Sequence, residues 1–442
     1  MNEKTDSANK VITCSLLFAA QSFSFMIRFA FGVVAPVLMQ MYRISPKAMG
    51  YVLSGWNWSY TAGLPIMGII VDRFGPYIVL GIGSLVWGLF TVALPIATTA
   101  VSLFLMRMVF GVGQTTVLPA GALAVFRGFS MRERARVIAV VFSGNQVGLA
   151  IGATVAAFLL AKFGWHAVFY CIGAASLLLT LAWFTFYPDK TIGSSPPKSG
   201  GVAPRSASPT GRSLKERAGV VPEGTSPLAS LASPPNLGGE STPWLSLFRR
   251  RSTWGIAFGQ MGYLYAYFFF VSWLPGYLIL ERKMTLLQSG IFGALPFWAG
   301  LIGTLGGGWL GDYLIERGVS ITVSRKSIIG TGLSASTVFV VTAAYVEEAW
   351  LAVTLLTLCV GSLRLATGSV NSYPIDLAPR PMVGALTGIQ NFFGNIGGLL
   401  APIVTGYIVS ATGSFAASFV VAGGMALFGA ASYVFIVDNK LK

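Results

Sequence analysis

Long uncharged apolar runs alternate with short polar segments along almost the whole chain. Each run is about twenty residues or longer, the length that crosses the hydrocarbon core of a bilayer as a helix. Loops that carry charge, glycine or proline separate the runs. The pattern predicts twelve membrane-spanning helices in two sets of six, at residues 11–38, 48–71, 78–97, 101–126, 137–161 and 166–187, and then at 254–279, 285–311, 327–346, 350–375, 382–411 and 414–437.

A polar segment from Lys190 to Arg251 separates the two sets and is rich in serine, proline and glycine. Such a composition cannot bury enough apolar surface to fold by itself. The sequence therefore predicts an all-α membrane protein with an N-terminal six-helix bundle (1–189), a disordered cytoplasmic linker (190–253) and a C-terminal six-helix bundle (254–442). The linker ends in apolar residues followed by three arginines, which is typical either of a segment lying on an anionic membrane surface or of a simple stop-transfer cluster.

Composition and charge agree with a membrane protein. The 442 residues are 54% hydrophobic and 10% charged, with a mean hydropathy of +0.70, whereas a soluble domain has about 25% charged residues. Outside the predicted spans, 22 basic residues lie on the side of the termini and linker and 5 on the other side. Basic loops remain in the cytoplasm. We therefore expect both termini to be cytoplasmic in the inner membrane, with the lipid bilayer and not nucleic acid as the partner of this basic chain.

Three arginines interrupt the apolar runs: Arg28, Arg107 and Arg364. An arginine at the centre of a span costs about 2.5–3.5 kcal/mol on insertion scales, so it normally faces protein or water. No aspartate or glutamate lies inside a predicted span to neutralise them. Because guanidinium pairs with carboxylate, phosphate or sulfonate, the arginines indicate a cavity that binds an anion. The alternatives are that they bond to backbone carbonyls and that Arg364 supports a gate.

The two halves also share a short motif at corresponding places. Gly68-Ile-Ile-Val-Asp72-Arg73-Phe-Gly75 follows the second span, and Gly308-Trp-Leu-Gly-Asp312 follows the eighth. Internal repetition of this kind is common in transporters, which place their site between the repeats.

The first of these motifs resembles the loop between the second and third helices of the major facilitator superfamily. Within it, the chain resembles the anion:cation symporter branch, whose members carry sugar acids and other organic anions. The matching stretches are Arg28, Arg107 to Ala120, Phe163 to Trp165, Trp273 to Pro275 and Gly388 to Gly398.

This resemblance implies a central cavity lined by the first, fourth, seventh and tenth helices and opened alternately to each side. The three arginines, chosen by charge alone, fall on the first, fourth and tenth. We therefore expect a secondary transporter that imports a small organic anion, such as a sugar acid, carboxylate or sulfonate. We expect no enzyme activity, no cofactor and a monomer.

Two positions depart from the family pattern. In proton-coupled relatives an acid often precedes the first-helix arginine, and glutamate often follows the fourth-helix arginine by seven residues. Here those positions hold Ile27 and Gln114. Seven residues are about two helical turns, so Gln114 lies on the same face as Arg107 and can hydrogen-bond a substrate or the guanidinium. It cannot carry a proton, which leaves coupling to a proton or sodium ion elsewhere, anion exchange and facilitated diffusion as alternatives.

Further polar residues complete the predicted site. The resemblance implies substrate contacts at Tyr60 and Asn391, and we expect Gln146 and Tyr263, polar and aromatic residues on other spans, to complete the pocket. The alternative for each is a hydrogen bond that packs helices. The resemblance also implies that charged residues at the inner face form a latch that closes the cytoplasmic side, as opposed to a solvated loop. These residues are Asp72, Arg73 and Asp312.

Two other functions remain as alternatives. An organophosphate:phosphate antiporter also uses paired arginines, but its second one is expected on the seventh helix, where 254–279 has none. A transport-inactive anion sensor could use the linker to dock a partner. Enzyme chemistry lacks its parts, because one histidine and three scattered cysteines form no metal set.

Overall fold

The computed structural model describes residues 3–190, 244–378 and 382–438, and nearly all of them are helical. The first half contains α1 (Glu3–Met41), α2 (Pro46–Ala93), the short η1 (Leu94–Ile96), α3 (Ala100–Gln114), α4 (Val117–Gly128), α5 (Met131–Phe163) and α6 (Trp165–Phe186). The second half contains η2 (Trp244–Arg249), α8 (Arg251–Leu280), α9 (Leu286–Glu316), α10 (Ile321–Tyr345), α11 (Ala349–Leu365), α12 (Thr367–Leu377), α13 (Val383–Thr412), α14 (Ala416–Ala431) and the π-helical η4 (Ser432–Ile436).

The helix α2 contains two of the predicted spans. Its 48 residues would rise far beyond the about 30 Å of a hydrocarbon core. Its helical geometry is interrupted at Gly75, whose φ of 79° lies in the region that favours glycine, and Pro76 follows. The eleven apolar helices long enough to cross a membrane in the described residues therefore correspond to twelve spans, and the predicted fold class is confirmed.

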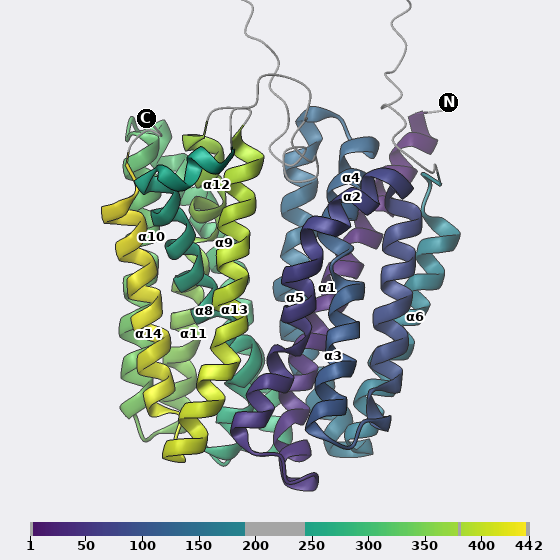
Figure 1. The fold of residues 1–442 in the computed structure, drawn as a ribbon, viewed down its shortest axis with the longest axis vertical. Coiled ribbons are helices and arrows are strands. Elements are labelled where there is room, and N and C mark those ends of the chain that lie inside the picture. Colours follow the sequence, from purple (N-terminus) through teal and green to yellow (C-terminus); the bar gives the residue numbers. More distant parts are fainter. Residues whose placement is uncertain (1–2, 191–243, 379–381, 439–442) are drawn as a thin grey trace, which may run out of the picture.

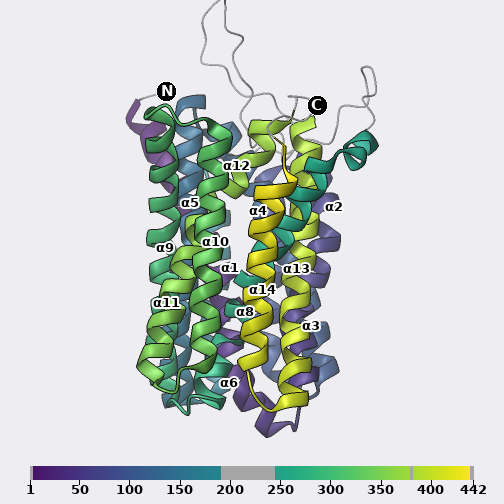
Figure 2. The same ribbon diagram turned by 90° about the vertical axis from the view of Figure 1, so that its left-hand side faces the viewer.

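The helices form two bundles, α1 to α6 and α8 to α14, standing side by side (Figure 1). In the second bundle α10 and α14 pack against each other at the surface (Figure 2). The start of α1 and the last described residues lie at the same end of the molecule, which we call the terminal end; the opposite end is the far end (Figure 1). Of the linker expected at 190–253, residues 191–243 lie outside the described residues, and the rest leads through η2 into α8.

Glycines allow α1 and α5 to approach closely within the first bundle. Gly144, Gly148 and Gly152 recur every four residues and face α1, so that a Cβ built on Gly148 would lie 2.1 Å from the carbonyl oxygen of Ser22. Small residues at this spacing bring helix backbones together in membranes. This contact fixes α1, the helix that carries Arg28, against its own bundle.

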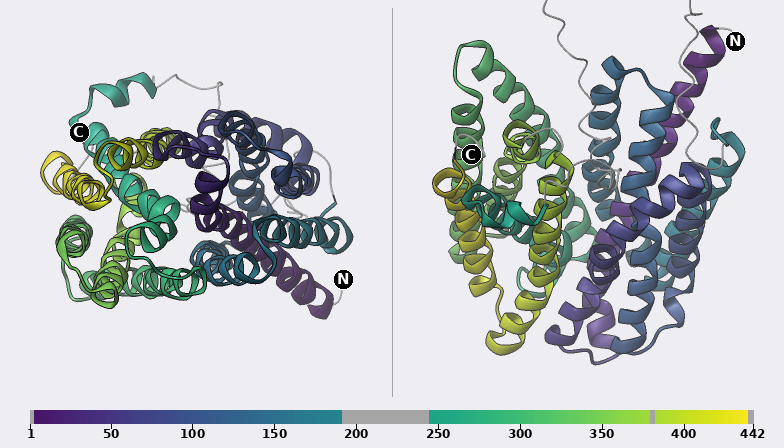
Figure 3. Two further views of the ribbon diagram at one scale, coloured as in Figure 1. Left: turned by 90° about the horizontal axis from the view of Figure 1, so that it is seen from below. Right: turned by 45° about the horizontal axis from the view of Figure 1, so that its top comes forward.

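The two bundles contact each other through α1 with α8, α2 with α13 and α5 with α9 (Figure 3). At the far end the contact between α2 and α13 is very close: a Cβ on Gly50 would lie 2.5 Å from the carbonyl oxygen of Pro402, and a Cβ on Gly406 would lie 2.5 Å from that of Pro46.

The same two helices separate toward the terminal end. A Cβ built on Gly68 of α2 or Gly388 of α13 would meet no described atom within 4 Å. The bundles therefore touch at the far end and diverge toward the terminal end, as the views in Figures 1 and 3 also show.

Candidate functional site

Arg28 lies in the middle of α1 with only 5% of its surface exposed. Its Nε donates to Oε1 of Gln114 at 2.7 Å, and Nε2 of Gln114 donates to the carbonyl oxygen of Ser24 at 3.0 Å. The guanidinium lies over the rings of Trp56, at 3.8 Å, and Phe25, at 4.4 Å. A neutral amide and two aromatic faces thus hold this cation in place without neutralising it.

Arg107 lies on α3 and is also buried. Its Nη2 donates to the carbonyl oxygen of Leu53 at 3.0 Å, and its guanidinium lies 4.3 Å from the ring of Phe31. Its Nε is buried without a hydrogen-bond partner in the described part of the chain. Arg107 lies about two turns before Gln114, the partner of Arg28, on the same helix. Gln114, expected beside Arg107, hydrogen-bonds Arg28.

Arg364 forms a second cluster at the end of α11. Its Nη1 donates to the hydroxyl of Tyr263 at 2.9 Å, and its guanidinium lies 4.8 Å from the ring of Tyr267. The hydroxyl of Tyr267 donates to Oε1 of Gln146 at 2.8 Å. Because Gln146 comes from α5, this cluster joins the two bundles.

The three arginines form no salt bridge with any carboxylate among residues 3–190, 244–378 and 382–438. In these residues ion pairs join Lys10 to Glu133, Arg127 to Asp189, and Arg325 to Asp376, all toward the terminal end. The buried positive charge at the centre of the molecule is therefore not balanced by a described acid.

The two polar residues that the resemblance places in the site behave differently. Tyr60 lies in the first cluster, with its ring 5.5 Å from Cζ of Arg28 and packed edge-on against Trp56. Asn391 instead donates to the carbonyl oxygen of Thr387 within its own helix, at 3.0 Å. Tyr60 therefore lies beside Arg28, whereas the side chain of Asn391 is bonded to the backbone of its own helix, α13.

The three charged residues predicted to form a latch at the inner face do not pair with one another in the described part of the chain. Asp72 is half-buried, Arg73 and Asp312 are exposed, and none of the three forms an ion pair within 4.0 Å in the described residues. The lack of such a pair agrees with the divergence of the bundles at the terminal end.

A different ion pair at this end joins α1 to α5. Nζ of Lys10 lies 3.2 Å from the carboxylate of Glu133. Hydrogen bonds from the side chain and backbone N–H of Ser130, followed by that from Lys10, lower the pKa of Glu133 to about 2. Both partners belong to the first bundle, so this pair does not hold the bundles together.

Sequence reasoning missed four residues that the structure places at or beside the clusters: Trp56, Phe25, Thr367 and Asn57. Trp56 precedes Tyr60 by four residues, so helical spacing could have placed it on the same face. Asn57 donates through Nδ2 to the backbone oxygen of Asn395 on α13, at 2.9 Å. No sequence signal distinguishes this cross-bundle contact from an ordinary polar residue in a span.

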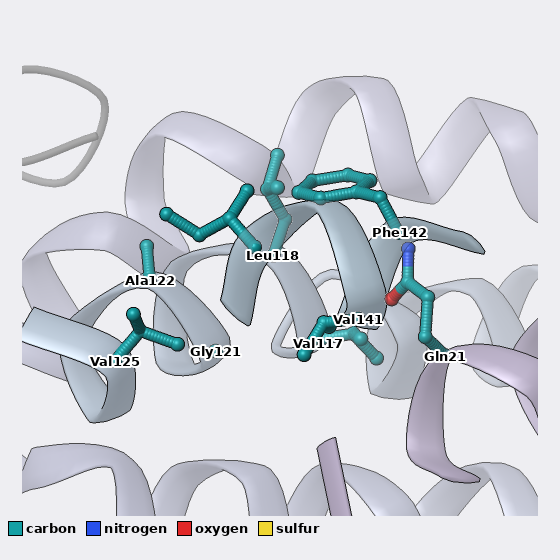
Figure 4. Close-up of a pocket in the computed structure, with 9 residues that line it drawn as sticks. Gln21, Val117, Leu118, Gly121, Ala122, Val125, Val141 and Phe142 are labelled. Atoms are coloured by element: carbon teal, nitrogen blue, oxygen red, sulfur yellow. The ribbon is translucent and has the colours of Figure 1, made fainter. Parts of the chain in front are cut away.

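A small surface depression lies between α1, α4 and α5, as Figure 4 shows. Its lining is apolar, including Val117, Leu118 and Phe142, with the amide of Gln21 at one side. None of the three arginines lines it. The depression therefore offers no charge to an anion and is separate from the candidate site.

Two six-helix bundles, with arginines inside membrane-spanning helices that no described acid neutralises, have the architecture of a membrane transporter. The sequence pattern described as Major Facilitator Superfamily matches residues 17–402. The chain belongs to this superfamily, as predicted.

Similar proteins extend over nearly the whole chain. The chain is 29% identical over 425 residues to a hexuronate transporter of Bacillus subtilis (96% of this chain, 93% of the relative). It is 30% identical over 425 residues to a probable sulfoacetate transporter of Cupriavidus necator (96% and 92%). It is 29% identical over 434 residues to a probable galactarate/D-glucarate transporter of Escherichia coli K12 (96% and 94%).

Solved structures show the same fold. A bacterial homologue of the human lysosomal transporter Spinster, in an inward-facing and unoccupied conformation, superposes with a TM-score of 0.70 at 16% sequence identity, covering 99% of this chain and 96% of that one.

Proposed function

We propose that this transporter imports a small organic anion across the cytoplasmic membrane by alternating access. The observation that carries the proposal is Arg28, a buried cation positioned by the neutral amide of Gln114 at 2.7 Å. Its Nη1 and Nη2 make no hydrogen bond in the described residues, so the paired donors that suit a carboxylate or sulfonate remain available.

Arg107 adds a second positive charge near the first. An anion between the two guanidinium groups would offset the cost of burying them. Tyr60, beside Arg28, and Asn391, after release of its bond to Thr387, would meet the neutral hydroxyl or carbonyl groups of the substrate. The relatives named for hexuronate, sulfoacetate and galactarate or D-glucarate support an organic acid as the substrate.

The distribution of basic residues, 22 against 5, supports an orientation with the terminal end in the cytoplasm. In that orientation the described conformation is open to the cytoplasm. Asp72, Arg73 and Asp312 would then form the latch only after the bundles close at that end. Residue 114 carries no proton, so symport with a proton or sodium ion would use another site.

The experiment that tests this function is uptake into proteoliposomes. The purified full-length protein is screened by thermal shift against galactonate, galactarate, glucuronate and sulfoacetate, and uptake of the stabilising acids is then measured with radiolabel. We expect Arg28→Ala and Arg107→Ala each to lower uptake about tenfold or more, because each removes a charge-assisted hydrogen bond.

Arg251→Ala is the matched control, since Arg251 is exposed and lies outside the site. It should reach the membrane and transport like the native protein. Near-native uptake by both the Arg28 and the Arg107 variants would refute the proposed function.

A further inference from the structure

Arg364 is a buried, positively charged residue that lies outside the Arg28 site. It is 8% exposed, its guanidinium lies over Tyr267, and its one side-chain hydrogen bond goes to the hydroxyl of Tyr263. Its Nε is buried with no hydrogen-bond partner in the described residues. A buried charged donor without an acceptor is costly, so the native protein would be expected to supply one.

The protons around Tyr263 can be assigned from the contacts. The hydroxyl of Thr367 donates to the carbonyl oxygen of Arg364 at 2.6 Å. Thr367 has only one proton, so Tyr263 donates its own proton to Thr367, at 2.8 Å, and accepts from Arg364. The bond from Arg364 to Tyr263 therefore orients the guanidinium and leaves its charge unneutralised.

A second buried donor lies beside Arg364. Oε1 of Gln146 accepts from Tyr267, but its Nε2 has no partner among the described residues. A Cβ built on Gly300 would lie 2.3 Å from Nε2 of Gln146 and 3.2 Å from Cγ of Arg364. The side chains of Gln146 and Arg364 thus both border Gly300, and the unsatisfied N–H group of each requires an acceptor such as a carboxylate or sulfonate oxygen.

A row of aromatic rings connects this place to the first site. The guanidinium of Arg28 lies on Trp56, whose ring centroid is 5.4 Å from that of Phe268. The ring of Phe268 is 5.5 Å from that of Tyr267, on which Arg364 lies. One cation stands at each end of the row, one from each bundle, so a monoanion would leave one of them without a counter-ion.

We propose that Arg364 and Gln146 form a second anion subsite, and that the transported substrates are organic dianions whose two acidic groups bind Arg28 in one bundle and Arg364 in the other. This inference rests on the proposed function and narrows its substrate class. A ligand that bridges the bundles also binds only when both bundles present their donors.

The test compares pairs of ligands that differ by one acidic group. Binding of galactarate against galactonate, and of sulfoacetate against acetate, is measured by titration calorimetry on the purified full-length protein. We expect the native protein to bind the dianion of at least one pair about tenfold or more tightly, because the second acidic group gains charge-assisted hydrogen bonds.

Arg364→Gln should abolish this preference and leave the monoanion affinity within about twofold, since the remaining acidic group still binds Arg28. Gln146→Ala should reduce the preference in part. Arg251→Gln, a change of the same kind at an exposed arginine of the same bundle, should keep it.

The outcomes separate the two proposals. The proposed second subsite is refuted if the native protein binds both members of each pair with equal affinity, and this result requires no variant. A preference that persists in Arg364→Gln, or an equal loss of monoanion and dianion binding, also refutes it, because Arg364 would then only support the fold. Unchanged binding of all four ligands by Arg28→Gln would instead refute the Arg28 site.

Discussion

Arg28 shows how a single neutral side chain prepares a charged one for a ligand. The amide oxygen of Gln114 accepts a hydrogen bond from the guanidinium, and the amide N–H group donates to the carbonyl oxygen of Ser24. The orientation of Arg28 is therefore fixed before any ligand arrives, which lowers the cost of ordering it on binding. A carboxylate at residue 114 would orient the same guanidinium, but it would also neutralise it.

That difference makes Gln114→Glu a direct test of the role of the amide. At neutral pH the new carboxylate would pair with Arg28 and compete with the substrate, so uptake should fall. Pairing with Arg28 lowers the pKa of the new carboxyl below the usual value for glutamate, about 4.3, so the loss of uptake should persist from pH 7 down to about pH 5. Initial uptake rates at several pH values in this range, with the external substrate fully ionised throughout, give the measurement. Native-like uptake by the Gln114→Glu variant across this range would contradict this role of Gln114.

At this scale the sequence revealed the charges but not their partners. Arg28, Arg107 and Arg364 stand out because a cation in an apolar run is unusual. Trp56 is not distinguishable in the same way, since aromatic residues are ordinary in membrane spans. The bond from Arg28 to Gln114 depends on where α1 lies relative to α3, which no local pattern specifies.

Among the helices, the fourth span of each half is interrupted next to a candidate residue. The first interruption follows Gln114 and separates α3 from α4, and the second follows Arg364 and separates α11 from α12. The backbone stays in the α-helical region at both places, so each is a local irregularity within one continuous span. The two halves therefore share more than the glycine-rich loop motif.

Glycine and proline flank these places, with Gly113 and Pro119 around the first and Gly368 after the second. Pro119 has no N–H group to bond to the carbonyl of Thr115. Hydroxyl groups add to the effect. Thr115 and Thr116 donate to the carbonyl oxygens of Val112 and Gly113, and Thr367 donates to that of Arg364. Such bonds compete with the helix for its carbonyl groups and bend it.

The close contact of α1 with α5 predicts a stability effect. In Gly148→Ala the new methyl group meets the backbone of Ser22, which cannot move away like a flexible side chain. We expect a loss of about 1–3 kcal/mol of stability from overpacking, seen as a lower melting temperature in detergent.

Gly306→Ala is the matched control, because a Cβ there meets no described atom within 4 Å. It should melt at the native temperature or slightly higher, since alanine favours a helix more than glycine does. Similar melting temperatures for the two variants would show that the backbones of α1 and α5 are not in close contact.

For the molecule as a whole, twelve spans in two bundles could be predicted because length and hydropathy determine where the chain crosses the membrane. The conformation could not. Apolar runs mark the spans in any state of a transporter, whereas contacts such as that of Gly50 with Pro402 and the open space at Gly388 belong to one state.

Alternating access requires the far end to separate during each cycle. There the hydroxyls of Tyr51 on α2 and Tyr407 on α13 lie 3.1 Å apart. With both tyrosines replaced by cysteine, in a background where Cys14, Cys171 and Cys359 are replaced by serine, a short bis-methanethiosulfonate linker should block uptake, and reduction should restore it.

Each single cysteine variant, treated in the same way, should continue to transport. If the fully cross-linked double variant also transports at the native rate, the far end does not open and the described arrangement is not one state of an alternating cycle.

The unbalanced arginines at the centre of the molecule also bear on energetics. No described carboxylate lies beside them. The arginines would balance the negative charge of a bound acid only while it is bound, because they remain in the protein when the acid is released. Entry into a cell with a negative interior then costs about 2.3 kcal/mol per charge for each 100 mV. A voltage-clamped membrane should register this movement as a current, unless an outgoing anion or accompanying cations cancel it.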